Sequence, residues 1–143
     1  MDDFECSLCH DDREPLWFDP EWRITSAASE GYPHYYLVVS QRHVAELTDL
    51  EDRVRLRGNE IVASVERALR DELRPSKINV ASLGNAVPHV HWHVVARFDN
   101  DPTFPGSIWS PAIRDTAEQS ELSAVGGENV RRAIRDAMRA GGM

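Results

Sequence analysis

His89, His91 and His93 occupy alternate positions in the run PHVHWHVV, residues 88–95. The chain has six histidines, so half of them lie within five consecutive residues. Successive side chains of a β-strand point to opposite faces. A strand here would place three imidazoles on one face and the intervening apolar side chains on the other. The pattern therefore predicts one wall of a chemical site backed by a hydrophobic core.

Three imidazoles on one surface allow three interpretations. They could be exposed strand residues without a special role. They could bind a catalytic metal, since His-x-His on a strand presents two imidazoles to one zinc ion. However, no Asp or Glu lies within five residues of the three histidines to complete such a site. One histidine could instead be a nucleophile flanked by the others, because an imidazole with an ordinary pKa of about 6.5 is available near neutral pH.

The loop before the histidines favours the nucleophilic interpretation. Gly84 and Asn85 lie between two predicted strands. A glycine there allows backbone N–H groups to turn toward an anion and form a nest for phosphate oxygens. Amide donors of this kind stabilise the charge that develops when a nucleophile attacks phosphorus. The combination predicts phosphoryl chemistry more specifically than either feature alone.

Five strands are predicted from the apolar runs and the turn residues between them. They cover about residues 16–18, 22–27, 34–40, 77–83 and 89–98. A long helix follows the third strand, with Thr48 and Glu51 as a capping box at its start and Pro75 setting its limit. Its apolar stripe comprises Leu50, Val54, Ile61, Val65, Leu69 and Leu73, with Gly58 on the same stripe.

Two further segments complete the predicted fold. Residues 99–111 are rich in Pro, Gly and Asp and are expected to be irregular. A short basic amphipathic helix is predicted at about residues 128–139, after Gly126 and Gly127. One long helix beside five strands predicts an α+β antiparallel fold.

Length and charge bound the function. A chain of 143 residues predicts a single domain over residues 1–143. The net charge of −8 gives no electrostatic reason to expect a nucleic-acid polymer as partner. No apolar run approaches the roughly 20 residues that span a bilayer, and the acidic N-terminus lacks a signal-peptide pattern. We therefore expect a cytoplasmic protein without a membrane partner, in which the two cysteines do not form a structural disulfide.

The residues described above resemble the histidine triad (HIT) family of nucleotide hydrolases and transferases. Residues 89–95 match its His-φ-His-φ-His-φ-φ signature, where φ is apolar, and residues 37–44 resemble its Pro-Lys-x-His segment. Residues 77–88 resemble the lead-in to the triad, and residues 99–109 resemble the tail of a bacterial subgroup. The resemblance covers about residues 4–110, which leaves a C-terminal extension. It implies a HIT-like fold with a five-stranded antiparallel sheet, and a homodimer.

The resemblance also implies roles for the site residues. His91 matches the nucleophile that attacks the α-phosphate and becomes nucleotidylated, before water releases the nucleoside monophosphate. His93 matches the residue that assists the leaving group, and the backbone carbonyl of His89 matches the group that orients the nucleophilic ring. The phosphate-contacting positions match Asn79, Gly84, Asn85 and Ala86. The implied activity is hydrolysis of purine nucleotide conjugates, as a phosphoramidase or a dinucleoside polyphosphate hydrolase, without a catalytic cofactor.

Several positions depart from the family pattern. Tyr35 stands where many members carry a fourth histidine, and Ala86 stands where many carry a hydroxyl. Ser40 and Gln41 replace the Pro-Lys pair, and Thr103 stands where the subgroup often has a histidine. These changes leave substrate choice and turnover open. They keep two alternatives in view, a non-catalytic nucleotide-binding protein and a metal-dependent hydrolase that uses the triad as ligands.

Cys6 and Cys9 form a Cys-x-x-Cys motif near the N-terminus. The pair could be two free thiols, or a redox pair, although no thioredoxin-like helix follows it. A structural zinc needs four ligands. Some bacterial members of the family complete such a site with the histidines that match His43 and His89, so the resemblance implies a structural zinc. His10 is an alternative third ligand.

The remaining candidates receive structural interpretations. His34 is expected to be a surface strand residue. Trp92, Phe104 and Trp109 are expected in the core or an interface rather than stacked on a base.

Overall fold

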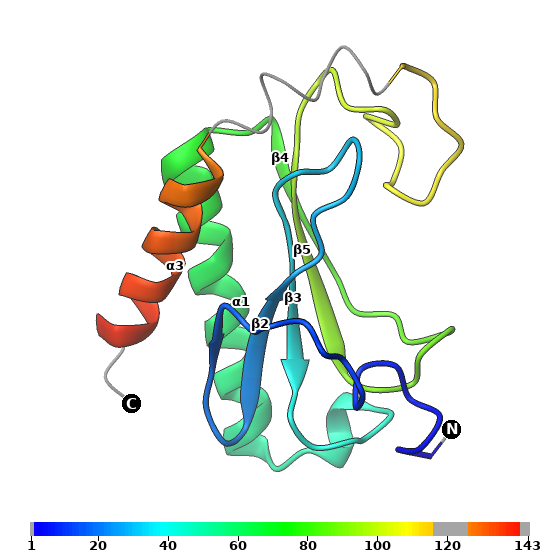
Figure 1. Ribbon diagram of the computed structural model, residues 1–143, viewed down its shortest axis with the longest axis vertical. Coiled ribbons are helices and arrows are strands. Elements are labelled where there is room, and N and C mark those ends of the chain that lie inside the picture. The colour runs from blue at the N-terminus through cyan, green and yellow to red at the C-terminus, as the bar shows by residue number, and fades with distance from the viewer. Residues whose placement is uncertain (1, 116–125, 141–143) are drawn as a thin grey trace.

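The structure, a computed structural model, describes residues 2–115 and 126–140. Its five-stranded antiparallel sheet has the order β1-β2-β3-β5-β4 (Figure 1). The strands are β1 (Trp17–Phe18), β2 (Trp22–Ser26), β3 (Tyr35–Ser40), β4 (Lys77–Ala81) and β5 (His91–Arg97). The predicted α+β class is confirmed, and the predicted strands differ from the observed ones by at most two residues at each end.

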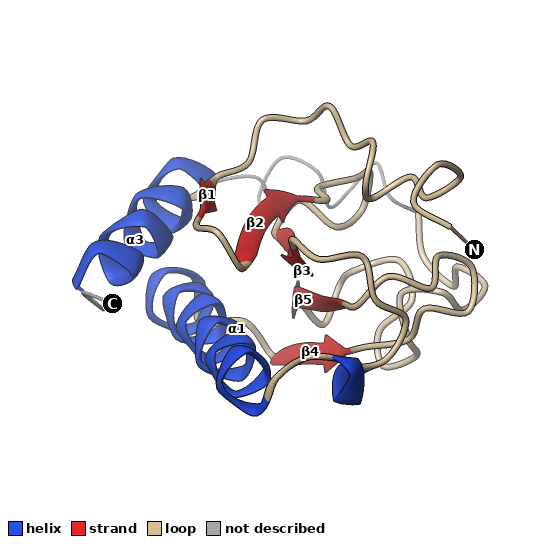
Figure 2. Cartoon of the chain, turned by 90° about the horizontal axis from the view of Figure 1, so that it is seen from below, coloured by secondary structure: helices blue, strands red, loops and turns tan. Residues whose placement is uncertain are grey.

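Helices α1 (Asp52–Leu73) and α3 (Gly127–Ala140) lie side by side on one face of the sheet (Figures 1 and 2). The predicted apolar stripe of α1 faces the sheet, with Ile61, Val65 and Leu69 almost fully buried. The predicted C-terminal helix is present, and Val130, Ile134 and Met138 join the same core. The buried residues of both helices thus follow the 3.6-residue periodicity of an amphipathic helix.

Gly58 has a packing role on this stripe. A Cβ atom at Gly58 would lie 2.3 Å from the Trp22 ring, so only glycine allows helix and strand to approach this closely. The Trp22 side chain is fully buried, and its indole N–H donates to the Val54 carbonyl at 3.0 Å. Trp22 thereby fastens β2 to the first turns of α1.

The predicted capping box at Thr48 and Glu51 is wrong. The acidic cap lies earlier, where the Asp49 carboxylate accepts from the Glu46 N–H at 3.0 Å on the 3-10 helix η1 (Leu47–Asp49). Glu51 is the N-cap residue of α1 and makes no side-chain cap. Leu50 has an extended backbone between the two helical segments, which interrupts the continuous helix that the periodicity suggested. At the other end, Arg74 adopts a left-handed conformation and Pro75 follows it, as predicted.

The register of β5 places His91 and His93 on the face opposite the helices. His91 pairs with Val39 and His93 pairs with Leu37, whereas Trp92 and Val94 point into the helix-covered core. This face is covered by connecting segments rather than by helices (Figure 2). Among them is the N-terminal segment, whose Cys6 and Leu8 pack on strand β3.

His89 lies outside the strand, contrary to the prediction. Strand β5 begins at His91. Before it, the Val90 N–H donates to the Val44 carbonyl, and the Val90 carbonyl accepts from Ser40. The chain here bonds to the segment after β3 as well as to β3 itself, so strict alternation stops one residue short of His89. His89 therefore occupies a different environment from the other two histidines.

Among the described residues, no helix is long and apolar enough to cross a membrane.

Candidate functional site

His91 is held in one orientation by the backbone. Its ring Nδ1 lies 2.6 Å from the His89 carbonyl oxygen, and its side chain is buried. A carbonyl can only accept a hydrogen bond, so Nδ1 carries the proton of the neutral ring. The lone pair is then on Nε2, which has the electronic character required of a nucleophile.

His93 lies beside His91 and is held by a side chain rather than by the backbone. Its Nδ1 is 2.6 Å from the Tyr35 hydroxyl, and its ring centre is 4.9 Å from that of His91. Burial, with a smaller contribution from His91, lowers the pKa of His93 to about 4. His93 is therefore a neutral imidazole at neutral pH.

A small cavity joins the glycine loop to His91. It has a volume of about 200 Å³ and is lined by Gly84, Ser82, His91 and residues 45–48, among others. Gly84 has a φ of 93°, a conformation that side chains rarely adopt. Ligand pockets usually exceed about 300 Å³, so this cavity matches a phosphoryl group better than a whole nucleotide. Asn85 and Ala86 are exposed on the loop and do not line the cavity.

Asn79 is engaged within the protein. Its side-chain oxygen accepts from the Arg97 guanidinium at 2.7 Å. Asn79 pairs with Val95 in the sheet, two residues further along β5 than His93. Asn79 shares the histidine face, but its oxygen is already used by an internal hydrogen bond.

Arg97 and Asp101 form a buried ion pair that sequence reasoning missed. Arg97 Nε lies 2.6 Å from Asp101 Oδ2, and Nη2 lies 3.0 Å from Oδ1. Nη2 also donates to the Gly106 carbonyl at 2.8 Å. The pair fastens the irregular segment after β5 to the strand. An arginine ending an apolar strand, four residues before an aspartate, was the available signal.

Trp109 belongs to this irregular segment after β5 and lies beside His93. The Trp109 ring lies edge-on to His93 with ring centres 5.0 Å apart, and 55% of its surface is exposed. Of the two positions expected, core or interface, Trp109 does not occupy the core, whereas Trp92 packs against it. Phe104 is partly buried under the Arg97 guanidinium, 5.5 Å from ring centre to Cζ.

The structure also shows the surroundings of Thr103 and His34. Thr103, where the subgroup often has a histidine, is buried, and its hydroxyl lies 2.5 Å from the Tyr32 hydroxyl. His34 is fully buried rather than a surface residue, with its ring 6.3 Å from that of Phe98. Phe98, the first residue after β5, lies against His34, a contact that no local pattern reveals.

The Cys-x-x-Cys motif and two distant histidines form a compact cluster. One ligand atom from each of Cys6, Cys9, His43 and His89 lies within 4.8 Å of the others. Cys9 Sγ is 3.3 Å from His43 Nδ1 and 3.5 Å from His89 Nδ1, and the two Nδ1 atoms are 3.1 Å apart. His10 is exposed and lies outside this cluster.

Hydrogen bonding and charge prepare the cluster for a cation. The His89 Nε2–H donates to the Ser40 carbonyl at 2.7 Å, which leaves Nδ1 unprotonated in the neutral ring. Although burial opposes it, hydrogen bonds from the Cys9 and Leu8 backbone lower the pKa of the Cys6 thiol. Burial and the neighbouring Cys6 raise the pKa of Cys9 to about 11. Without a metal, Cys9 therefore keeps its proton at neutral pH, and a bound cation would favour its thiolate form.

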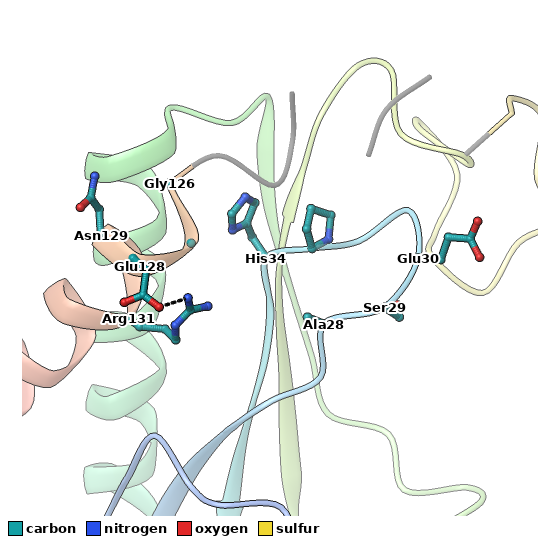
Figure 3. A pocket seen from close by; sticks show the side chains of 10 residues that line it. Ala28, Ser29, Glu30, His34, Gly126, Glu128, Asn129 and Arg131 are labelled. Carbon is teal, nitrogen blue, oxygen red and sulfur yellow. Dashed lines mark hydrogen bonds and ion pairs between the residues drawn. The ribbon is translucent and has the colours of Figure 1, made fainter. Parts of the chain in front are cut away.

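A larger cavity lies away from the histidine site. It measures about 690 Å³ and opens between the β2–β3 connection and the first turn of α3 (Figure 3). Two of its charged side chains pair with each other, because the Glu128 carboxylate lies 2.5 Å from the Arg131 guanidinium. Neither His91 nor His93 lines it.

The structure defines an α+β protein with an oriented pair of histidines beside a small cavity. Comparison with known proteins identifies its family. The HIT domain model matches residues 13–100, so the chain belongs to the HIT family. The curated Protein hit of Bacillus subtilis is 27% identical over 84 residues, which cover 55% of this chain and 57% of that protein. The match thus spans little more than half the length of this relative.

Solved structures extend the similarity over most of the chain. A histidine triad protein from Bradyrhizobium japonicum is 27% identical, with a TM-score of 0.69, covering 92% of this chain and 94% of that one. A zinc-bound histidine triad family protein from Mycobacterium smegmatis is 21% identical, with a TM-score of 0.64, covering 97% and 99%. The latter similarity concerns the fold.

Proposed function

We propose that this protein hydrolyses purine nucleotide conjugates at the α-phosphate through a nucleotidyl intermediate on His91. The hydrogen bond from His91 Nδ1 to the His89 carbonyl carries this proposal, because it directs the Nε2 lone pair away from the backbone. Membership of a nucleotide-binding family of hydrolases supports the substrate class. The leaving group is an amine or a phosphate, and water releases the nucleoside monophosphate from His91.

The cavity beside His91 supports in-line attack on a phosphorus atom that would bind there. This cavity has a volume that suits one phosphoryl group, and Gly84, with its φ of 93°, lines it. Backbone amides around Gly84, Asn85 and Ala86 would donate to the phosphate oxygens as charge develops on them. His93, which lies beside His91 and is neutral, would assist the leaving group.

A metal-dependent hydrolase that uses the triad as ligands is less well supported. The three imidazoles do not converge on one point, because the His89 ring faces the cysteines and the His91 ring is held by a carbonyl. Within residues 2–115 and 126–140, the histidine–cysteine cluster is the only group with metal-ligand geometry, and it includes neither His91 nor His93.

Trapping the intermediate tests the proposal. The protein is mixed with adenosine 5′-phosphoramidate for a single turnover and digested for mass spectrometry. We expect one adenylyl group on the peptide that contains His91, and none in a His91→Ala variant. Turnover without this adduct, or an adduct on another residue, contradicts the proposed mechanism.

We further propose that Cys6, Cys9, His43 and His89 hold a structural zinc. Tetrahedral zinc with bonds of about 2.0 to 2.3 Å places its ligand atoms roughly 3.3 to 3.7 Å apart. The observed sulfur–nitrogen distances of 3.3 and 3.5 Å fit this geometry. The zinc-bound structure from Mycobacterium smegmatis is consistent with such a site. When bound, zinc would supply a structural crosslink between the N-terminal segment and the backbone beside His91.

Metal content and stability test the zinc site together. Denatured wild-type protein is expected to release about one zinc ion per chain, and Cys6→Ser is expected to release little and to unfold at a lower temperature. Ser7→Ala, a change at an exposed neighbouring position, is the matched control. A native protein without metal, with stability unaffected by Cys6→Ser, would exclude the site.

A further inference from the structure

We propose that Tyr35 is a positioning residue that donates its hydroxyl proton to His93 Nδ1, so that His93 presents an Nε2–H donor to the leaving group. This inference rests on the proposed function. It assigns a role to a residue whose type departs from the family pattern. The contact is short, 2.6 Å from hydroxyl oxygen to Nδ1, and links adjacent strands β3 and β5.

The three histidines differ in what holds their rings. His89 and His91 each donate to a backbone carbonyl, which only accepts, so their tautomers follow from geometry alone. His93 instead contacts a hydroxyl, which can donate or accept. The direction of this single hydrogen bond therefore decides which His93 nitrogen carries the proton.

Two observations favour donation by Tyr35. First, burial raises the pKa of Tyr35, so the hydroxyl keeps its proton, and the structure gives this hydroxyl no hydrogen-bond partner among the described residues besides His93 Nδ1. Second, His91 already presents a bare Nε2 in the neighbouring ring. A second bare nitrogen would repel an anionic phosphate, whereas an Nε2–H donor on His93 complements it.

The reaction balances with this arrangement. The His91 Nε2 lone pair forms a bond to phosphorus as the bond to the leaving group breaks. The electron pair of the broken bond goes to the departing oxygen or nitrogen, where the His93 Nε2–H hydrogen bond stabilises the charge. The proton that neutralises the departing group comes from water, because His93 and Tyr35 retain their own protons.

The His93 ring contacts Trp109 as well as Tyr35. The Tyr35 ring is tilted against His93 with ring centres 5.8 Å apart, and Trp109 meets His93 edge-on. Two aromatic side chains thus confine the imidazole while the hydroxyl sets its tautomer. Loss of the Tyr35 hydroxyl alone should leave the His93 ring in place but no longer favour one of its two tautomers.

Leaving-group dependence separates this role from a merely structural one. The probes are the p-nitrophenyl and phenyl esters of adenosine monophosphate, a good and a poor leaving group. Tyr35→Phe is expected to lower kcat/KM about tenfold for the phenyl ester and by less than about threefold for the p-nitrophenyl ester. Tyr36→Phe removes the neighbouring hydroxyl on the opposite face and should leave the ratio unchanged. An equal loss on both probes with Tyr35→Phe overturns the proposal.

A measurement without substrate distinguishes failure of this proposal from failure of the proposed function. Nitrogen NMR of the wild-type protein, with His93 assigned from a His93→Gln spectrum, reports which ring nitrogen is protonated. We expect protonation at Nε2, and a mixture of tautomers in Tyr35→Phe. Protonation at Nδ1 in the wild type overturns the assignment, whether or not either ester is hydrolysed.

Discussion

The two faces of the central sheet are built in different ways. On the helix face, regularly spaced apolar residues of α1 and α3 meet alternating residues of the strands in one continuous core. On the histidine face, the covering comes from the N-terminal segment and the segment after β5. The first is held by a small apolar cluster and a hydrogen bond from Arg23, and the second by the Arg97–Asp101 ion pair. The helix face is stabilised mainly by an extensive apolar core, whereas the histidine face has a smaller apolar cluster and depends more on individual hydrogen bonds and ion pairs. Substitutions should therefore have different consequences on the two faces.

The largest effect on activity is expected on the histidine face at His91. His91→Ala removes the group that bonds to phosphorus, so turnover of adenosine 5′-phosphoramidate should fall by more than about a thousandfold. Affinity for adenosine monophosphate should stay within about tenfold, because the lost interaction belongs mainly to the transition state. Kinetics and calorimetry measure the two quantities, with the exposed His10→Ala as control. Robust turnover by His91→Ala would show that His91 is not the nucleophile and that the histidine face is not the catalytic face.

The largest effect on stability is also expected on the histidine face. Asp101→Asn leaves the Arg97 guanidinium buried without its charged partner, which should cost about 3 to 5 kcal/mol of unfolding free energy. Asp99→Asn makes the same chemical change at an exposed position and should cost no more than about 0.5 kcal/mol. Urea denaturation compares the two variants. Similar losses in both would mean that the ion pair does not anchor this face.

A smaller effect is expected on the helix face at Gly58. Gly58→Ala places a methyl group into the Trp22 ring, and overpacking of this kind costs about 1 to 3 kcal/mol. The better helix propensity of alanine returns up to about 1 kcal/mol. The adjacent exposed Asn59→Ala should not destabilise the protein. If Gly58→Ala proves as stable as Asn59→Ala, the close approach of α1 to β2 is not required.

The smallest effect concerns the pH dependence of stability. The pKa of His93 is lowered from 6.5 to about 4 in the folded state, so between these values the unfolded state binds more protons. Stability should therefore fall as pH is lowered through this window. His93 is only partly buried, so solvent screening reduces the effect. Urea denaturation between pH 7 and pH 4 should show a shallower decline in His93→Gln, and parallel curves would argue against the lowered pKa.

The helix face was predictable because its information is local. The stripe of Ile61, Val65 and Leu69 repeats at the helical period, and each residue lies where the pattern predicts. The boundaries were less predictable. The capping box was misplaced by two residues because Thr48, Asp49 and Glu51 all suit a helix start, and the extended Leu50 between η1 and α1 decided among them.

The histidine face was predictable only in part. The spacing of His91 and His93 indicated a shared strand face, and β5 confirms it. The position of His89 was not predictable from alternation, because Val90 bonds to the segment after β3 and ends the regular pattern. Asn79 matched a family position, yet its hydrogen bond to Arg97 depends on the pairing of β4 with β5, which brings together residues 18 positions apart.

The sequence by itself determined the histidine spacing, the apolar periodicities and the thiol pair. These features are local in the chain and follow from residue types alone, so they indicated the family, the α+β class and the kind of chemistry. Only the tertiary structure decided what each histidine contacts. His89 meets two cysteines more than 75 residues away in the sequence, separated by 83 and 80 positions. His93 meets Tyr35 across 58. Ring orientation and tautomer are set by such contacts between distant segments, and no pattern along the chain encodes them directly.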